Sequence, residues 1–234
     1  MSADRVRTHV VTGAGSGIGR AAAERLHARG DRLVLLARSE ERAAALRAAY
    51  DGAVVELLDL ADPAAVAAWT PPADVDRVDA LLHVAGVVDL GPVAGLDVGS
   101  WQETLAVNLT APALLTRTLL PALRAARGTV VLVNSGAGRT AHAGWSSYAA
   151  SKFGLRGFAD ALREEEAPHG VRVSTVYPGR TATPMQEAVH AQEGAAYEAE
   201  RFIDPATVAE AVLACVDLPR DATVPEVVLR PGPR

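Results

Sequence analysis

Cysteine and lysine are almost missing from this sequence of 234 residues: Cys215 is the only cysteine, and Lys152 is the only lysine among 23 basic side chains. A lone cysteine has no partner for an intrachain disulfide and is too few for a zinc cluster. We therefore expect that the protein is located in the cytoplasm, which is a reducing compartment, and that it has no metal site. We interpret Cys215 as a small buried apolar residue rather than a reactive thiol.

A basic surface and a long hydrophobic run are also missing. The formal net charge is -5, and the arginines form no block, so the sequence does not predict a nucleic-acid partner. No apolar stretch approaches the roughly 18 residues that a membrane-spanning helix needs. A glycine-rich motif already begins at Thr12, which leaves no space for a cleavable signal peptide. We expect a protein without a membrane partner.

Short apolar runs alternate with helical patterns along the whole chain, and 49% of the residues are hydrophobic. Most of these runs are continuous rather than alternating, which is typical of parallel strands buried on both faces. The sequence predicts a doubly wound α/β fold, with helices on both faces of the sheet, in one domain over residues 1–234. The expected strands are Thr8–Thr12, Arg32–Ala37, Ala53–Leu57, Val78–Val84, Thr129–Asn134, Arg172–Tyr177 and Glu226–Leu229.

Proline residues suggest where helices begin, bend or end. Asp62 before Pro63 is typical of a helix start. The segment 100–126 contains Pro112 and Pro121, so we expect it to be kinked or divided. The polar, alanine-rich segment 184–202 follows a strand end, where it is either a lid over substrate or a plain surface helix.

A glycine-rich loop over Thr12–Gly19 joins the first strand to a helical run. Glycine allows a tight turn and lets the backbone approach a pyrophosphate, whose charge the unpaired N–H groups of a helix N-terminus can hold. The context predicts a dinucleotide site rather than a merely tight turn. A mononucleotide P-loop would need a lysine after the last glycine, where Arg20 stands. The residues of this loop that we expect to contact the dinucleotide are Gly13, Ser16, Gly17, Ile18 and Gly19.

The end of the second strand bears on the choice of cofactor. An acidic residue there would bind ribose hydroxyls and repel a 2′-phosphate, but this chain has Arg38 and Ser39. A guanidinium binds phosphate in a bidentate manner, and a serine adds a hydroxyl donor, so the sequence favours NADP(H) over NAD(H). The alternative is that Arg38 pairs with a nearby glutamate. Asp59, after the third strand, either accepts a hydrogen bond from adenine or forms a turn.

Tyr148 and Lys152 stand four residues apart, on one face of a predicted helix. To transfer protons near neutrality, a phenol with an ordinary pKa of about 10 needs a pKa lower by about 3 units, or some 4 kcal/mol. A cation about 5 Å away contributes roughly 3 kcal/mol at an effective dielectric near 20. We therefore expect Lys152 to supply most of the change in the pKa of Tyr148. An ordinary solvated pair is the alternative.

The glycine loop and the Tyr148-x-x-x-Lys152 pair together resemble the short-chain dehydrogenase/reductase family, over essentially the whole chain. The resemblance implies a seven-stranded Rossmann-type sheet, a homodimer or homotetramer, and a tetrad of Asn108, Ser135, Tyr148 and Lys152. It implies that Ser135 binds the substrate oxygen and that the backbone at Asn108 holds a water connected to the lysine. Further cofactor contacts implied by the resemblance are Ala85, Gly86, Tyr148, Lys152, Pro178, Gly179, Thr181 and Thr183.

Three positions depart from the family pattern: His83 replaces an asparagine, Thr181 a branched aliphatic residue, and Ser16 a residue that is often basic in NADP-preferring members. We interpret His83 as a packed polar residue, not as a catalytic base. The cofactor preference therefore depends mainly on Arg38. The helical segments over residues 100–126 and 147–166 are candidate subunit interfaces, or their apolar faces are buried against the sheet.

The resulting hypothesis is a reversible, NADP(H)-dependent oxidoreductase for a small ketone, aldehyde or secondary alcohol, with Tyr148 as the general acid and base. Trp145, His142 and Met185 are expected to line a moderately apolar substrate pocket. The alternative is a catalytically idle NAD(P)-binding sensor or scaffold of the same fold, which would need the glycine loop but neither Ser135 nor Tyr148.

Overall fold

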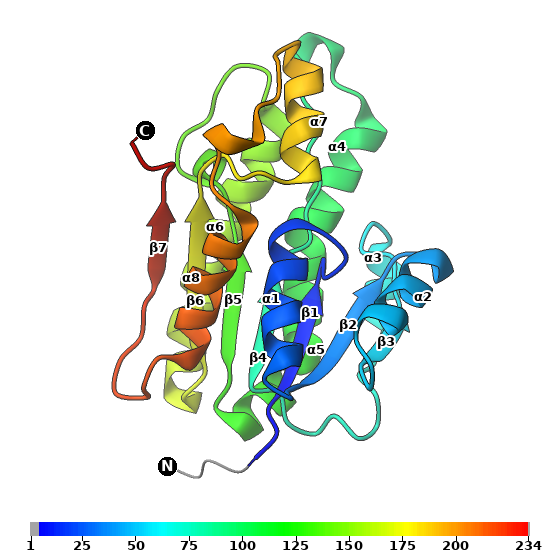
Figure 1. Cartoon of the computed structure of the whole chain (residues 1–234), viewed down its shortest axis with the longest axis vertical. Coiled ribbons are helices and arrows are strands. Elements are labelled where there is room, and N and C mark those ends of the chain that lie inside the picture. The colour runs from blue at the N-terminus through cyan, green and yellow to red at the C-terminus, as the bar shows by residue number, and fades with distance from the viewer. Residues whose placement is uncertain (1–4, 234) are drawn as a thin grey trace.

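Seven parallel strands form one sheet in the computed structural model, which describes residues 5–233 (Figure 1). The strand order is β3-β2-β1-β4-β5-β6-β7, so the chain winds outward twice from β1, as predicted. The strands are β1 (Thr8–Thr12), β2 (Arg32–Ala37), β3 (Val54–Leu57), β4 (Ala80–His83), β5 (Thr129–Val133), β6 (Arg172–Pro178) and β7 (Glu226–Leu229).

The predicted strands match the observed ones closely, and the side chains of the five inner strands are almost all buried, whereas the edge strands β3 and β7 are partly exposed. Every residue of β1 and of β5 is buried. Only β4 is clearly shorter than expected, beginning at Ala80 rather than Val78. Val78 instead donates its N–H to the Ala122 carbonyl, outside the sheet.

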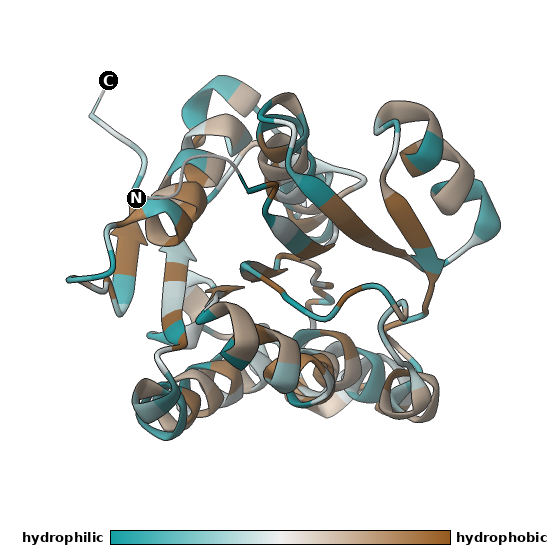
Figure 2. Ribbon diagram, turned by 90° about the horizontal axis from the view of Figure 1, so that it is seen from below, coloured by the Kyte–Doolittle hydropathy of each residue, from teal (hydrophilic) through white to brown (hydrophobic). Residues whose placement is uncertain are grey.

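Helices cover both faces of the sheet (Figure 2). One face packs against α1 (Gly17–Ala28), α2 (Glu40–Ala49) and α8 (Pro205–Asp217), and the other against α3 (Pro63–Ala68), α5 (Ala111–Ala126) and α6 (Ser146–Glu166). A further helix, α4 (Val98–Leu105), packs against α6, and α7 (Pro184–Glu193) lies beyond the carboxyl ends of the strands (Figure 1). No helix in the described range is long and apolar enough to cross a membrane.

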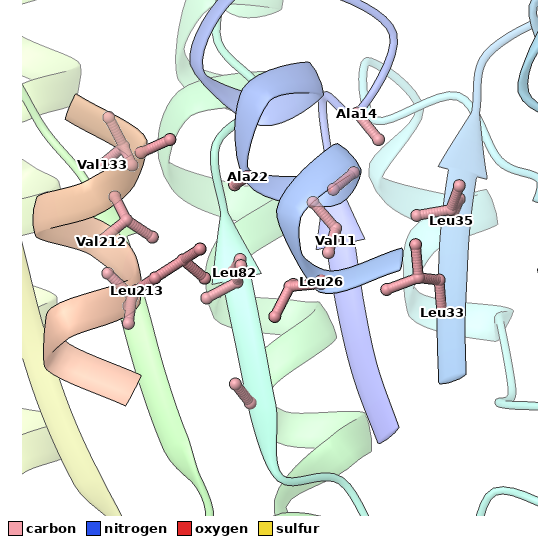
Figure 3. Close-up of a cluster of buried hydrophobic side chains, with 14 of the residues drawn as sticks. Val11, Ala14, Ala22, Leu26, Leu33, Leu35, Leu82, Val133, Val212 and Leu213 are labelled. Carbon is pink, nitrogen blue, oxygen red and sulfur yellow. The ribbon is translucent and has the colours of Figure 1, made fainter. Parts of the chain in front are cut away.

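Alternate residues of the strands face two separate hydrophobic clusters. In β2, Leu33 and Leu35 pack with α1 and α8, whereas Val34 packs on the opposite face with α3 and α5. Figure 3 shows the first cluster, where Leu26 of α1 and Val212 of α8 meet the sheet. Each such fully buried aliphatic side chain contributes about 1.5–3 kcal/mol. This burial fixes the register of the strands and so the positions of the loops that follow them.

The segment 100–126 is divided, as expected, by a π-helical turn (Ala106–Thr110) between α4 and α5. The N–H of Ala111 bonds to the Ala106 carbonyl, five residues back. Pro112 has no N–H, so the Asn108 carbonyl lacks the partner that an α-helix would give it. Pro121 lies inside α5 without dividing it.

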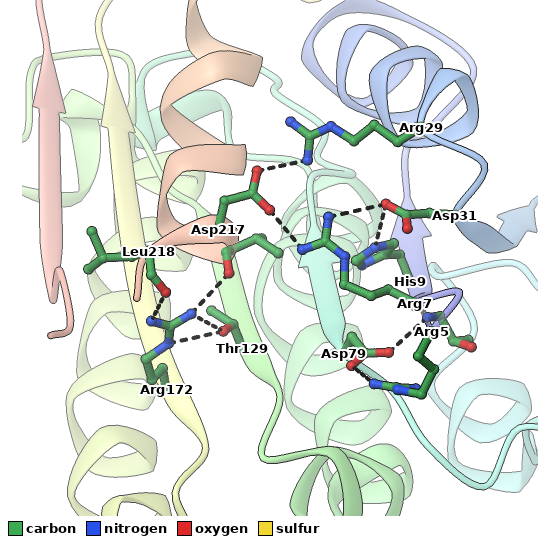
Figure 4. A network of polar contacts seen from close by, with 12 residues as sticks. Arg5, Arg7, His9, Arg29, Asp31, Asp79, Thr129, Arg172, Asp217 and Leu218 are labelled. Carbon is green, nitrogen blue, oxygen red and sulfur yellow. Dashed lines mark hydrogen bonds and ion pairs between the residues drawn. The ribbon is translucent and has the colours of Figure 1, made fainter. Parts of the chain in front are cut away.

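Ion pairs fasten the amino ends of the strands (Figure 4). Asp217, at the end of α8, pairs with Arg7 at 2.8 Å and with Arg29 at 2.7 Å. Asp31, before β2, accepts from Arg7 at 3.4 Å and contacts His9 Nε2 at 3.1 Å. These charges close one end of the sheet, and the carboxyl ends of the strands remain open for a site.

Candidate active site

A cleft of about 1470 Å³ crosses the carboxyl ends of the strands. Parallel α/β sheets bind ligands at this edge, because the loops there diverge on either side of the central strands. The predicted site residues that line it are Gly13, Ser16, Gly17, Ile18, Gly19, Arg38, Asp59, Ala85, Gly86, Ser135, Tyr148, Lys152, Pro178, Gly179, Thr181 and Thr183. Asn108 and Ser39 are the two predicted residues that do not line it.

The glycine loop folds too tightly for side chains. Gly13 has a φ of +75°, and a Cβ there would lie 2.8 Å from the Ala85 backbone nitrogen. A Cβ on Gly19 would lie 2.1 Å from the Gly13 carbonyl oxygen. Both contacts are shorter than any relaxed packing allows, so the sequence must have glycine at these positions. The loop therefore exposes backbone atoms, without side chains, to the cleft.

The helix that follows this loop begins without a capping side chain. Ser16 makes no capping hydrogen bond to α1, and the first turn of α1 contains no acidic residue. By contrast, α2, α3, α4, α7 and α8 each begin with a side-chain oxygen that accepts from their first turn. The uncapped N–H groups and the positive end of the helix dipole fit a pyrophosphate. The residues present therefore suit a dinucleotide cofactor.

Two arginines line the cleft near the carboxyl end of β2. Arg38 follows β2 and is exposed, with no hydrogen bond or ion pair to residues 5–233, so the expected alternative of pairing with a glutamate is not observed. Arg42 is a residue that the sequence reasoning missed; its Nη1 lies 3.8 Å from the position of a Cβ on Gly15. Ser39 caps α2 by accepting from the Arg42 N–H at 3.3 Å. This cap places Arg42 in the first turn, facing back toward the strand end.

Asp59 has a turn role as well as a place in the cleft. Its Oδ1 accepts from the Ala61 N–H at 3.0 Å, which is an Asx turn.

Thr183 caps α7 and also lies against the glycine loop: a Cβ on Gly17 would be only 2.9 Å from Thr183 Cγ2. The loop after β6 therefore packs directly on the glycine loop.

Tyr148 and Lys152 share one face of α6, as their spacing predicts. Both are buried, at 7% and 4% exposure, yet both line the cleft. Lys152 Nζ lies 5.7 Å from the centroid of the Tyr148 ring and donates to the Val133 carbonyl at 3.1 Å. Ser135, at the end of β5, accepts from the Ala137 N–H at 3.1 Å, which leaves its hydroxyl proton to donate. The polar side chains of Tyr148, Lys152 and Ser135 therefore lie together along the cleft.

Burial changes the pKa values of this pair. It raises the pKa of Tyr148 above its ordinary value, and the hydrogen-bonding hydroxyl of Ser135 lowers it by a smaller amount. The expected net lowering of the phenol's pKa is not observed, because a Coulomb calculation from spacing leaves out the larger cost of desolvating the phenolate. Burial also lowers the pKa of Lys152 to about 8.

Two asparagines connect, by hydrogen bonds, the elements that carry the site residues. Asn108 Oδ1 accepts from the Val87 N–H at 2.9 Å, while Nδ2 donates to the Val87 carbonyl at 2.9 Å and to Ser151 Oγ at 3.1 Å. Asn134 donates to the Lys152 carbonyl at 3.0 Å and accepts from the Ser135 N–H at 2.8 Å. Asn134 was not predicted, although it ties β5 to α6 and so sets Ser135 against Lys152.

His83 lies outside this constellation. Its Nε2 contacts Thr116 Oγ1 at 2.9 Å, and burial lowers its pKa to about 3. The ring is therefore neutral at physiological pH, in keeping with its interpretation as a packed polar residue. Thr181 donates to the Gly179 carbonyl at 2.9 Å, so the family departure at this position stabilises the turn after β6.

The other end of the cleft is lined by mixed groups. Trp145, His142 and Met185 are there, as expected, and the Trp145 ring meets the Tyr148 ring edge-on at 5.8 Å. Arg180 and Arg230 were not predicted, since they follow β6 and β7 and reach the cleft only through the fold. In residues 5–233 no group of three or more acidic, histidine or cysteine side chains could hold a metal ion.

Comparison with known proteins identifies the family. Residues 7–194 match the short chain dehydrogenase family. The chain is 34% identical to the 3-oxoacyl-(acyl-carrier-protein) reductase FabG of Escherichia coli (strain K12), over 77% of this chain and 75% of the relative. It is 33% identical to the trans-4-hydroxycyclohexanecarboxylate dehydrogenase of Sinomonas cyclohexanicum, over 78% and 76%.

A solved structure agrees in fold over nearly the whole length. A metagenomic short-chain oxidoreductase in complex with NADP superposes with a TM-score of 0.78 and 32% identity, covering 97% of this chain and 98% of that one. The chain belongs to the short-chain dehydrogenase/reductase family and is an oxidoreductase that acts on CH–OH and C=O groups.

Proposed function

We propose that the protein is an NADP(H)-dependent carbonyl reductase and alcohol dehydrogenase in which Tyr148 is the general acid and base. The observation that carries this proposal is the meeting of Tyr148, Ser135 and Lys152 in the cleft that begins at the uncapped helix α1. The names of the two relatives describe the reduction of a 3-oxoacyl group on a carrier protein and the oxidation of a hydroxycyclohexanecarboxylate. A small ketone or secondary alcohol fits this site.

The bound nicotinamide supplies the hydride in reduction and accepts it in oxidation. In reduction, Ser135 donates its hydroxyl proton in a hydrogen bond to the substrate oxygen and so polarises the carbonyl. Tyr148 is protonated at neutral pH, because its pKa is raised, and it gives its phenolic proton to the same oxygen. Lys152 stabilises the phenolate that this leaves behind, since an ammonium over a buried ring acts through little water.

Replacing the proton on Tyr148 calls for a path to solvent. The Asn108 carbonyl faces the gap made by the π-helical turn and by the missing N–H of Pro112. A Cβ on Gly86 would lie 3.2 Å from Asn108 Oδ1 and 3.8 Å from Lys152 Nζ, so these two residues approach the same glycine. We assign Asn108 the role of positioning a water that exchanges protons with Lys152.

The preference for NADP(H) follows from charge at the adenosine end. Arg38 and Arg42 both line the cleft, and neither has a carboxylate partner within residues 5–233. A 2′-phosphate would provide the anion that these guanidiniums lack. Arg42 therefore takes the place of the basic residue that Ser16 does not supply.

The segment 184–202 is the proposed substrate lid. Helix α7 is held to the loop after β6 by Arg180, which donates to both Glu193 oxygens at 2.8 and 2.9 Å. Gln192 accepts from the Leu90 N–H at 2.8 Å, which ties the same, carboxyl-terminal end of α7 to the loop after β4. Opening would break these contacts and expose the buried face of α7, which carries Gln186, Val189 and His190.

A homodimer or homotetramer is the proposed assembly. Val98 on α4 and Phe153 on α6 are 63% and 43% exposed, and α4 packs beside α6. Apolar side chains of this size on neighbouring helices favour burial against a second copy. Light scattering of the wild type and of Phe153→Asp tests it; a monomeric wild type would rule the assembly out.

A catalytically idle cofactor sensor is the competing function. A panel of small ketones and secondary alcohols, followed by nicotinamide absorbance with each cofactor, separates the two. Turnover of any member supports the enzyme. Tight NADPH binding with no turnover across the panel would support the sensor instead.

A further inference from the structure

Five arginines line the cleft, and they differ in whether a carboxylate neutralises them. They are Arg38, Arg42, Arg180, Arg201 and Arg230. Arg180 pairs with Glu193 at 2.8 Å, and Arg201 pairs with Glu198 at 3.5 Å. Arg38 and Arg42 belong to the adenosine end. At the substrate end, Arg230 is therefore the one arginine without a carboxylate partner among the residues that the structure describes.

The main chain fixes where Arg230 stands. It directly follows β7, and the neighbouring Leu229 carbonyl accepts from the Gly179 N–H at 2.9 Å. A Cβ on Gly179 would lie 3.1 Å from Pro231 Cδ and 3.7 Å from the Arg230 Cα, so the two strand ends are packed closely. Arg230 is thus anchored to the loop that follows β6, and it is not part of a loose tail.

The guanidinium of Arg230 extends toward the reacting groups. Its Nη1 lies 3.9 Å from the position of a Cβ on Gly136, and Gly136 is the residue next to Ser135. Consecutive Cα atoms are only about 3.8 Å apart, so the cation stands one residue from the proposed carbonyl ligand. Gly136 has no side chain to separate them.

Most of the hydrogen-bonding capacity of this guanidinium is unused. Its hydrogen bond within the described range runs from Nη1 to the Leu229 carbonyl at 3.2 Å. Arginine has five N–H donors in a planar fork that matches a carboxylate. The side chain is exposed to the cleft, so a ligand can reach it without a rearrangement.

We propose that Arg230 binds a carboxylate of the substrate, so that the enzyme acts on oxo acids and hydroxy acids with the carboxylate a few bonds from the reacting carbon. This inference rests on the proposed function, because it takes Ser135 and Tyr148 as the groups that bind the reacting oxygen. Arg230 then orients the substrate from the far side of Ser135. Neutral ketones lack the second attachment point.

Paired substrates test this assignment. Michaelis constants for acetoacetate and for methyl acetoacetate are measured with NADPH for the wild type, for Arg230→Gln and for Arg47→Gln. Arg47 lies on α2, pairs with Glu40 and does not line the cleft, so its variant matches the change in charge alone. We expect Arg230→Gln to raise the Michaelis constant for the acid about tenfold or more, as expected for a lost charge-assisted pair, and to leave that for the ester within about twofold. Arg47→Gln should change neither.

The outcomes separate the two proposals. Two results would overturn the carboxylate site but not the reductase. One is an equal effect of Arg230→Gln on the Michaelis constants for the acid and the ester. The other is a wild type that reduces the ester better than the acid. If neither compound turns over, binding decides: butanoate and butanamide are titrated into the NADP⁺ complex and followed by tryptophan fluorescence, to which Trp145 in the cleft contributes. Butanoate binding that Arg230→Gln abolishes supports the site, and its absence in the wild type refutes it.

Discussion

Lys152 Nζ lies over the Tyr148 ring, 5.7 Å from its centroid, and donates to the Val133 carbonyl at 3.1 Å. Both side chains are buried, so the charge of one acts on the other through a medium of low polarizability. The carbonyl of Val133 fixes the ammonium, and α6 fixes the phenol. The chemistry of the site depends on this arrangement.

The pH dependence of reduction should show the ionisation of Lys152. Its pKa is lowered to about 8, so the ammonium is present below that pH and lost above it, whereas Tyr148 keeps its proton because its pKa is raised. We expect kcat/KM for reduction to be flat through neutrality and to fall above about pH 8. His83, with a pKa of about 3, adds no limb between pH 5 and 7. A flat profile to pH 10 would contradict the role of Lys152.

Cofactor selectivity should depend on Arg38 and Arg42. Each alanine variant removes a charge-assisted contact, so we expect the Michaelis constant for NADPH to rise about tenfold or more and that for NADH to change by less than about twofold. Arg47→Ala, one turn further along α2, should change neither. The measurement is steady-state kinetics with both cofactors. Equal changes for NADPH and NADH would show that these arginines do not contact the phosphate.

An ion pair with one buried partner should make stability depend on pH. Glu166 is buried and accepts two hydrogen bonds from Arg124, at 2.9 and 2.6 Å, and this guanidinium holds the pKa of the carboxyl below its usual value. The ionised carboxylate therefore stabilises the fold above its ordinary pKa of about 4.3, and that contribution is lost as the pH falls through the lowered pKa.

Urea unfolding of Glu166→Gln measures this contribution. We expect the variant to lose about 1–2 kcal/mol of unfolding free energy at pH 7, since hydrogen bonds to a charged group are of this strength. The gap between variant and wild type should close as the pH is lowered toward 3. A gap of the same size at both pH values would show that packing, not charge, accounts for the loss.

The strands and the glycine loop could be predicted because local sequence determines them. Continuous apolar runs such as residues 33–37 favour burial on both faces, and the seven strands agree with expectation to within two residues at each end. Glycine at position 19 is required by a contact with Gly13 inside the loop, which local sequence determines. Glycine at position 13 is required by Ala85, which only the pairing of β1 with β4 brings close.

Other parts of the site depend on residues that only the fold brings together. Arg230 is far from Gly136 in sequence, and parallel pairing of β5, β6 and β7 places them at one edge. The raised pKa of Tyr148 depends on burial, which spacing does not reveal. The roles of the site residues as a set, the oligomeric state and a cytoplasmic location stay predictions.

The central claim is that the phenol of Tyr148 delivers the proton, and Tyr148→Phe tests it most directly, because the variant removes one oxygen and keeps the ring against Trp145. NADPH affinity by fluorescence and the reduction rate of the best ketone are measured on the same samples. We predict unchanged NADPH affinity and a rate lower by about 10²–10⁴-fold, the usual contribution of general acid catalysis. A variant that binds NADPH and reduces the ketone at the wild-type rate would contradict the account.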